Sequence, residues 1–233
     1  MRLAVIADVH ANLAALDAVL TSIGESGADV VLCLGDVVGY GPDPVPVLDR
    51  VREVCHTVVL GNHDEAVATG EGINVLPPDG QAAARHHREV LTAEQIDWLA
   101  GLPLIVEAFG VTLAHASPLD PASWSRLESY KEVSAQFAAF STDVCFVGHS
   151  HRPAVASDRL GVMRVRRGSR YLINVGSVGQ PRDRDSRAAY GLFDTEAFTF
   201  EQVRVRYDVA KTAARIREEG LPERLAERLG RGV

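Results

Sequence analysis

Short apolar runs alternate with segments of helical periodicity over the first 150 residues. The runs at 3–7, 30–34 and 57–60 are rich in valine, leucine and isoleucine, which predicts buried strands. Between them, the apolar residues at 13–23 fall on one helical face, and 43–54 has the pattern of a short helix behind a Gly/Pro loop. Strands that alternate with helices form crossover units, so we expect an α/β fold with a mainly parallel sheet.

Residues 65–101 differ from this pattern. They contain two helical segments, at 81–90 and 92–100, with no strand between them. We interpret 65–101 as a helical insertion that could form one wall of a site. After residue 101 the alternation of strands and helices returns. Two strands joined at Phe109-Gly110 are predicted in 104–115, a helix at 129–140 and a strand at 144–147.

Beyond residue 150 the pattern changes to short strands separated by turn residues. The expected strands lie at 162–165, 171–175, 188–193 and 198–207, which suggests an antiparallel continuation. The tail, 208–233, is charged and helical, with leucines along one stripe. We expect residues 1–233 to form a single domain.

Composition narrows the class of protein. The chain has 46% hydrophobic residues and a formal charge of −7, which is ordinary for a globular protein. This acidic balance gives no global attraction to long nucleic acids or anionic membranes. No run approaches the length of a membrane span, and the first apolar stretch is too short for a signal peptide. The three cysteines fit free thiols in a reducing compartment, so a cytoplasmic location is expected.

Five apolar runs end in residues that can bind a metal ion. Taken singly, each has an ordinary interpretation as a helix cap, a turn or a structural histidine. Five such ends together favour one shared site, because ligands of open α/β sheets bind outside the carboxyl ends of the strands. The candidate ligands are Asp8, His10, Asp36, Asn62, His115, His149 and His151.

The ordered motifs resemble those of the calcineurin-like metallophosphoesterases. The resemblance covers residues 3–151 and is carried by Asp8-x-His10, Gly35-Asp36, Gly61-Asn62-His63-Asp64, His115 and Gly148-His149-Ser150-His151. The loop 174–182 further resembles a late loop of the small bacterial branch, which includes phosphodiesterases and diadenosine tetraphosphatase-like relatives. The resemblance implies a four-layer αββα sandwich, here with the helical insertion.

The resemblance also implies a site with two divalent metal ions. One ion would take Asp8, His10, Asp36 and His151, and the other Asp36, Asn62, His115 and His149, so that Asp36 bridges them. Manganese is favoured by the mixed His/Asp/Asn ligands, and iron, cobalt, nickel or zinc also fit. A hydroxide between the ions would attack phosphorus. His63 would protonate the leaving oxygen or stabilise developing charge, oriented by Asp64.

Weaker features concern the substrate. No arginine follows Gly35-Asp36 closely, which disfavours the phosphate clamp of protein phosphatases. Arg182 is the best candidate for gripping distal phosphates, Tyr40 could stack on a base, and His86 on the insertion could touch substrate, although each also has a plain structural interpretation.

The sequence thus predicts a metal-dependent phosphoesterase acting on a small phosphorylated substrate. A nucleotide phosphodiester, including a cyclic nucleotide, or a dinucleoside polyphosphate is favoured. Alternatives are a phosphomonoesterase or protein phosphatase, and a catalytically silent scaffold like the retromer subunit of similar fold. The full set of ligand positions argues against the scaffold. The oligomeric state is left open.

Overall fold

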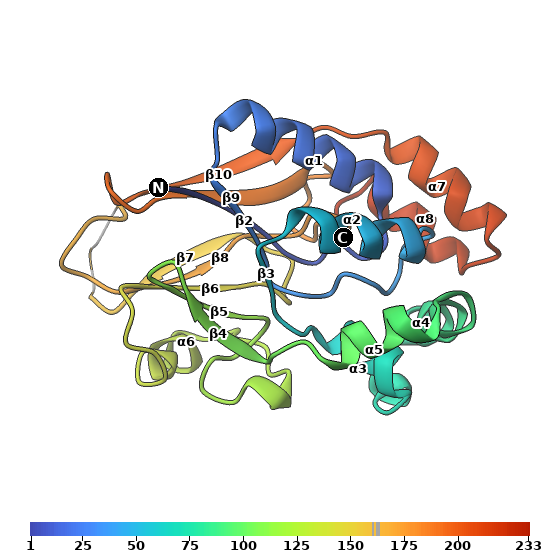
Figure 1. The fold of residues 1–233 in the computed structure, drawn as a ribbon, viewed down its shortest axis with the longest axis horizontal. Coiled ribbons are helices and arrows are strands. Elements are labelled where there is room, and N and C mark those ends of the chain that lie inside the picture. The colour runs from blue at the N-terminus through green and yellow to red at the C-terminus, as the bar shows by residue number, and fades with distance from the viewer. Residues whose placement is uncertain (160, 162–163) are drawn as a thin grey trace.

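The computed structural model describes residues 1–159, 161 and 164–233. Its strands form two stacked sheets (Figure 1), each with five strands in this described part. The first sheet has the order β10 (Thr199–Val205), β9 (Ala188–Asp194), β1 (Arg2–Ile6), β2 (Val30–Cys33) and β3 (Thr57–Val58). The second has the order β4 (Ile105–Ala108), β5 (Val111–Ala114), β6 (Val144–Val147), β8 (Tyr171–Asn174) and β7 (Ala154–Ser157).

The strand directions bring the predicted ligand segments to one end of the sandwich. In the first sheet β1, β2 and β3 run parallel, with Leu3 opposite Val30, while β9 runs antiparallel to β1. In the second sheet β5, β6 and β8 run parallel, with Leu113 opposite Phe146. The carboxyl ends of β1–β3 therefore lie together, as do those of β5 and β6.

The helices form three groups in Figure 1. On the outer face of the first sheet lie α1 (Leu13–Ser26) and α2 (Pro44–Val54), with α7 (Val209–Glu218) and α8 (Glu223–Leu229) beside them. The second sheet is covered by α6 (Tyr130–Gln136). The third group follows β3 and consists of α3 (Asn62–Thr69), α4 (Pro78–Val90) and α5 (Ala93–Ala100), with short 3-10 turns at Ile73–Val75 and, before α6, at Pro121–Ser123.

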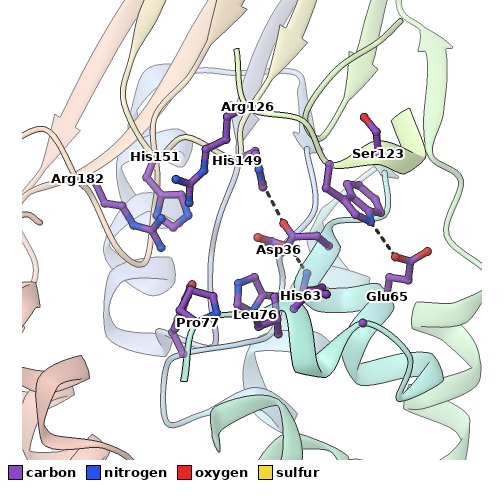
Figure 2. Close-up of a pocket in the computed structure, with 15 residues that line it drawn as sticks. Asp36, His63, Glu65, Leu76, Pro77, Ser123, Arg126, His149, His151 and Arg182 are labelled. Carbon is purple, nitrogen blue, oxygen red and sulfur yellow. Dashed lines mark hydrogen bonds between the residues drawn. The ribbon is translucent and has the colours of Figure 1, made fainter. Parts of the chain in front are cut away.

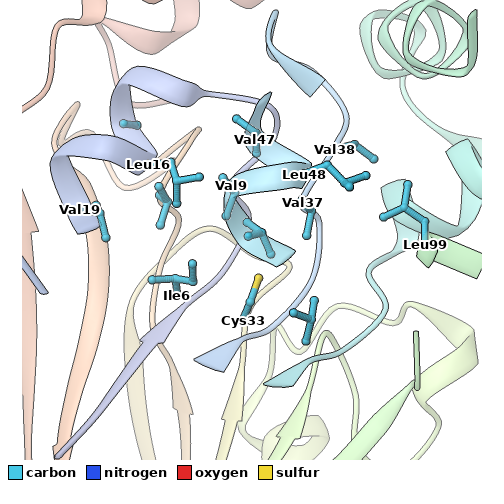
Figure 3. Packing of buried hydrophobic residues seen from close by; sticks show 14 of the residues in the cluster. Ile6, Val9, Leu16, Val19, Cys33, Val37, Val38, Val47, Leu48 and Leu99 are labelled. Carbon is cyan, nitrogen blue, oxygen red and sulfur yellow. The ribbon is translucent and has the colours of Figure 1, made fainter. Parts of the chain in front are cut away.

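Buried apolar side chains fill the spaces between the layers. Leu32 and Phe146 meet between the two sheets. Outside the first sheet, Ile6 packs in a cluster with Leu16 of α1 and Leu48 of α2 (Figure 3). Outside the second sheet, a smaller cluster joins its strands to Phe137 and Phe140. Burying each such side chain contributes about 1.5–3 kcal/mol. The αββα layering is as predicted.

The C-terminal helices pack behind the loops of the first sheet. Leu225 and Leu229 lie in one apolar cluster with Tyr40. The Thr212 hydroxyl donates to Asn12 Oδ1 at 2.9 Å, and Asn12 also caps α1. Gly232 accepts a backbone hydrogen bond from Arg184 at 2.8 Å. These residues lie outside the predicted ligand segments but hold them in place.

Several predicted elements differ from those observed. The mainly parallel sheet is in fact two mixed sheets. Beyond residue 150, β9 and β10 pair antiparallel as expected, whereas β8 pairs antiparallel with β7 on one side and parallel with β6 on the other. All four residues of β8 are buried, the position that a parallel strand favours. The edge strand β7 was missed, since its alanines and serine have weak strand propensity. The expected strand at 162–165 lies partly outside the described residues.

Candidate metal centre

The predicted ligands sit on tight loops that directly follow the strands. Asp8, His10, Asp36, His149 and His151 all have φ between 47° and 64°, the left-handed region. This conformation costs a residue with a side chain about 1–2 kcal/mol. Aspartate and histidine tolerate it better than most residues, and a cluster of such residues is typical of functional sites.

Glycines allow the loops to approach one another. A side chain on Gly61 would overlap Asp36, and one on Gly35 would meet the Gly61 nitrogen at 2.6 Å. A side chain on Gly148 would meet Asp8 Oδ2 at 2.9 Å. The glycines that precede Asp36, Asn62 and His149 are therefore required by close packing of the ligand loops.

Three histidines are fixed in orientation by backbone carbonyls. The Nδ1 atoms of His10, His115 and His151 lie 3.0, 2.7 and 2.6 Å from the carbonyl oxygens of Val38, Leu34 and Gln180. Because a carbonyl only accepts, each Nδ1 carries the hydrogen, and each neutral ring keeps a lone pair on Nε2. His10 Nε2 and His151 Nε2 then face each other at 3.1 Å. Two lone pairs at this distance repel unless a cation lies between them.

The carboxylates complete this convergence. Asp36 Oδ1 accepts the His63 backbone N–H at 2.8 Å, while its Oδ2 lies 3.5 Å from His10 Nε2 and 3.3 Å from His115 Nε2. Asp8 accepts the His149 backbone N–H, and its Oδ1 lies 3.5 Å from His151 Nε2. Both carboxylates are anchored by the backbone and point toward imidazole nitrogens.

The donor atoms form two overlapping groups. In each group, the atoms lie within 4.8 Å of one another. Asp36 belongs to both, and the Asn62 carbonyl oxygen lies 3.0 Å from His149 Nδ1 and 3.3 Å from His115 Nε2. Imidazole nitrogens and carboxylate oxygens without thiolates suit divalent metals such as manganese or zinc. The groups consist of Asp8, His10, Asp36 and His151, and of Asp36, His115 and His149.

Burial shapes the protonation of this cluster. Burial raises the pKa of Asp8 to about 7 and lowers the pKa of His10 and of His151 well below 6.5. For Asp36, burial raises the carboxyl pKa, but the neighbouring His115, His63 and His10 together outweigh burial and hold that pKa well below its usual range. Against its own burial, His115 is held by Asp36 with its pKa raised to about 9. In the protein alone a protonated His115 therefore balances the charge of Asp36, and a bound divalent cation would take over this role.

His63 lies beside the candidate ligands, closely packed against two other rings. Its ring centroid is 4.9 Å from that of His10 and 4.3 Å from that of Tyr40, and its buried Nδ1 has no hydrogen-bond partner. Burial lowers the pKa of His63 to about 4. Asp64 does not orient this ring, because its oxygens accept the backbone N–H groups of Val38 and Gly61. The expected His63–Asp64 contact is therefore wrong, and Asp64 instead fixes the loop and the start of α3.

Four of the candidate ligands, Asp36, Asn62, His149 and His151, line a pocket of about 270 Å³. Arg182 also lines it, with Cζ 5.4 Å above the Tyr40 ring. Figure 2 shows Arg182 and Arg126 on the side of His149 and His151. Tyr40 is only 4% exposed and packs among rings, which favours a wall over a stacking platform.

Two further lining residues were missed from the sequence. Trp124 and Arg126 follow the 3-10 turn before α6, and the Trp124 indole donates to Glu65 at 2.8 Å (Figure 2). Trp124 has φ of 52°, which no propensity rule predicts for tryptophan. No spacing pattern in the sequence marked this loop as part of the site.

The structure does not bring His86 to the pocket. Its Nε2 lies 3.6 Å from a Glu219 carboxylate oxygen on the C-terminal side of α7. The neighbouring His87 is the buried one: it accepts the Gly39 N–H at 3.0 Å, and its Nε2 lies 2.9 Å from the Gly41 carbonyl oxygen. Helix α4 thus supports the Tyr40 loop through His87.

Comparison with known proteins gives the class. Residues 1–197 match the family described as the calcineurin-like phosphoesterase superfamily domain. An uncharacterized protein of Methanocaldococcus jannaschii is 39% identical over 97% of this chain and 96% of its own length. The crystal structure of a metallophosphoesterase from Sphaerobacter thermophilus has a TM-score of 0.89 and 37% identity, and covers 100% of this chain and 99% of that one.

The phosphodiesterase YfcE of Escherichia coli is 25% identical over 85% of this chain and 90% of its own length. The chain therefore belongs to the calcineurin-like phosphoesterase superfamily. It is a metal-dependent phosphoesterase, with a cluster of aspartates and histidines that could hold metal. Among the described residues, no helix has the length and apolar character required to cross a membrane.

Proposed function

We propose that the protein hydrolyses a P–O bond of a small nucleotide, either a phosphodiester or a dinucleoside polyphosphate, with two divalent metal ions. The observation that carries this is the overlap of two donor groups at Asp36. One ion would be held by Asp8, His10, Asp36 and His151, and the other by Asp36, Asn62, His115 and His149. Manganese is our first choice for both positions.

Bound divalent ions would polarise the phosphoryl group and lower the pKa of a water molecule that attacks it. The chain's own residues prepare the site for this chemistry. Backbone carbonyls hold the Nδ1–H groups of His10, His115 and His151, so that the Nε2 atom of each ring would bind an ion, and His115, whose pKa is raised to about 9, would release its Nε2 proton on binding.

His63 serves as a hydrogen-bond donor to the phosphoryl or leaving oxygen. With a pKa near 4 it is neutral at physiological pH, and a neutral ring still donates one N–H. Its ring contacts both the His10 ring and the Tyr40 ring, which also contact each other, and Gly39 and Gly80 leave it room, since a side chain at either would meet it. Charge stabilisation by a positioned donor therefore fits His63 better than proton transfer from an imidazolium.

Arg182 and Arg126 supply positive charge to the same pocket. The Arg182 Nε is buried with no hydrogen-bond partner, and the charge of Arg182 lowers the pKa of His10 and His151. A second phosphate or a negatively charged leaving group would satisfy these guanidinium groups. A cytoplasmic location stays a prediction, supported by the free thiols of Cys33, Cys55 and Cys145.

The test is metal counting combined with a substrate screen. Purified protein is stripped with chelator, reloaded with manganese, and analysed for metal content and hydrolysis. Bis(p-nitrophenyl) phosphate, cyclic nucleotides, dinucleoside polyphosphates and phosphomonoesters are compared. We expect two ions per chain and the highest kcat/KM on a nucleotide diester or polyphosphate. One ion per chain, or a preference for monoesters, contradicts the proposal.

A further inference from the structure

A second cavity adjoins the metal-facing pocket. It has a volume of about 110 Å³ and shares His149 and Arg126 with the first pocket. It lies between the outer face of the second sheet and the segment that leads into α6. Its apolar wall is built from Leu127, Val133, Val147, Ala154, Ala156 and Leu172.

Several polar groups of this cavity are already hydrogen bonded within the protein. The Asn174 amide nitrogen donates to the Gly148 carbonyl and to Ser150 Oγ, and its oxygen accepts the Gly176 N–H. Arg152 donates its Nε–H to the Arg182 carbonyl at 3.0 Å. Apart from the guanidinium groups of Arg126 and Arg152, an occupant would find mainly apolar walls, which suit a flat ring.

The size and the charge boundary point to the same occupant. A closed apolar cavity of about 150 Å³ takes up benzene, and this smaller cavity, whose lining residues Ala154 and Val155 are exposed, has room for part of one flat ring. Arg126 stands where the two cavities meet, since it lines both. A molecule that spans them would place a negative group on the side of Arg126 and the donor atoms, and an apolar group among Leu127, Ala156 and Leu172.

We propose that this cavity binds the flat ring of the organic group that stays on phosphorus during hydrolysis, a nucleobase or an aryl ring, while the phosphoryl group lies in the adjoining pocket. This inference rests on the proposed hydrolysis and adds a determinant of specificity to it. The preferred substrates are therefore phosphoesters whose organic part is a flat ring within reach of His149, and simple alkyl esters are poor substrates because they leave the cavity unfilled.

The experiment uses two substitutions, one that fills the cavity with a larger side chain and one that adds a negative charge at its rim. Ala156→Phe occupies it from the side of β7, and Ala154→Asp places a carboxylate at its exposed rim. Ala100→Phe, at the exposed end of α5 and outside this cavity, is the matched control. KM is measured for phenyl and methyl diesters of the same p-nitrophenyl phosphate, and binding of phenylphosphonate and methylphosphonate is measured by thermal shift with manganese.

We expect Ala156→Phe and Ala154→Asp each to abolish the preference of phenylphosphonate over methylphosphonate and to raise KM for the phenyl diester about tenfold, equal to about 1.4 kcal/mol. KM of both cavity variants for the methyl diester should stay within about twofold of the wild-type value. KM of Ala100→Phe should stay within about twofold for both diesters, since Ala100 lies away from the cavity. Equal effects on both diesters, or none, overturn the cavity assignment. If the wild type hydrolyses neither diester, the proposed function fails, while the phosphonate comparison still tests the cavity.

Discussion

The floor and the wall of the pocket are built in opposite ways. The floor consists of buried aspartates and histidines held by backbone groups, as in the contacts of His115 with Leu34 and of Asp36 with His63. The wall carries side chains on a partly exposed loop, Trp124 and Arg126, tied down chiefly by one bond to Glu65. We infer that the floor sets the chemistry and the wall sets the substrate.

The largest expected effect is at the centre of the floor. Asp36→Ala removes the carboxylate shared by both donor groups, so we expect hydrolysis to fall by at least about 10³-fold and bound manganese to fall below one ion per chain. Metal analysis and initial rates measure both. Asp17→Ala, an exposed aspartate on α1, serves as the control. Two ions retained in Asp36→Ala would rule out its bridging role.

Removal of metal should have a comparable effect without changing the chain. A chelator should abolish hydrolysis, and manganese should restore it, because the proposed chemistry depends on bound divalent ions. The floor is prearranged by the backbone, so the circular dichroism spectrum should change little. Hydrolysis that resists the chelator would contradict a metal-dependent floor.

His63 should separate catalysis from metal binding. His63→Ala should lower kcat by about 10²-fold to 10³-fold, as expected for loss of one donor to developing charge, with metal content unchanged. His86→Ala is the matched control, since His86 faces Glu219 and should leave kcat within about twofold. A kcat unchanged in His63→Ala would place His63 among structural residues.

The wall should respond in KM rather than in kcat. Arg126→Ala and Arg182→Ala each remove a guanidinium group from the pocket, and we expect KM to rise about tenfold through loss of a charge-assisted contact. Metal content should hold in both variants. A loss of metal in Arg126→Ala would show that the exposed loop supports the floor. It would contradict the inference that the floor sets the chemistry and the wall only the substrate.

The smallest effect concerns the stability of the metal-free protein. In the folded state His63 has a pKa near 4, and His87 and His149 have pKa values near 3, whereas an unfolded histidine titrates near 6.5. The unfolded chain therefore binds more protons below pH 6.5, and stability falls as the pH drops toward 4. His10 and His151, with pKa values well below 6.5, act in the same direction. Asp8 and Asp64, with pKa values near 7, and His115, with a pKa near 9, oppose this trend, but the five histidines outnumber these three groups.

Urea denaturation should show a loss of at least about 2 kcal/mol between pH 7 and pH 5. His87→Gln, which removes one of these histidines away from the ligands, should flatten the curve. A metal-free protein that gains stability over the same interval would mean that the two aspartates dominate.

The gathering of the candidate ligands on the floor could be predicted from the sequence because each of them follows a strand closely. Once β1, β2 and β6 were placed, Asp8, Asp36 and His149 had to gather at one end, whichever sheet each strand joined. The wall gave no such signal: Trp124 and Arg126 lie in a loop whose left-handed turn depends on tertiary contacts. The choice between His86 and His87 failed for a similar reason, since neighbours on a helix point in different directions and only packing decides which is buried.

The loops that carry the candidate ligands depend on residues near α7 and α8, which lie beyond the part of the chain that matches the family. Thr212 donates to the residue that follows His10-Ala11, and Gly232 accepts from Arg184, four residues beyond the carbonyl that orients His151. A protein that ends at residue 197 would lack the contacts that Thr212 and Gly232 make with the loops after β1 and β8. We expect such a protein to bind manganese more weakly even if it still folds.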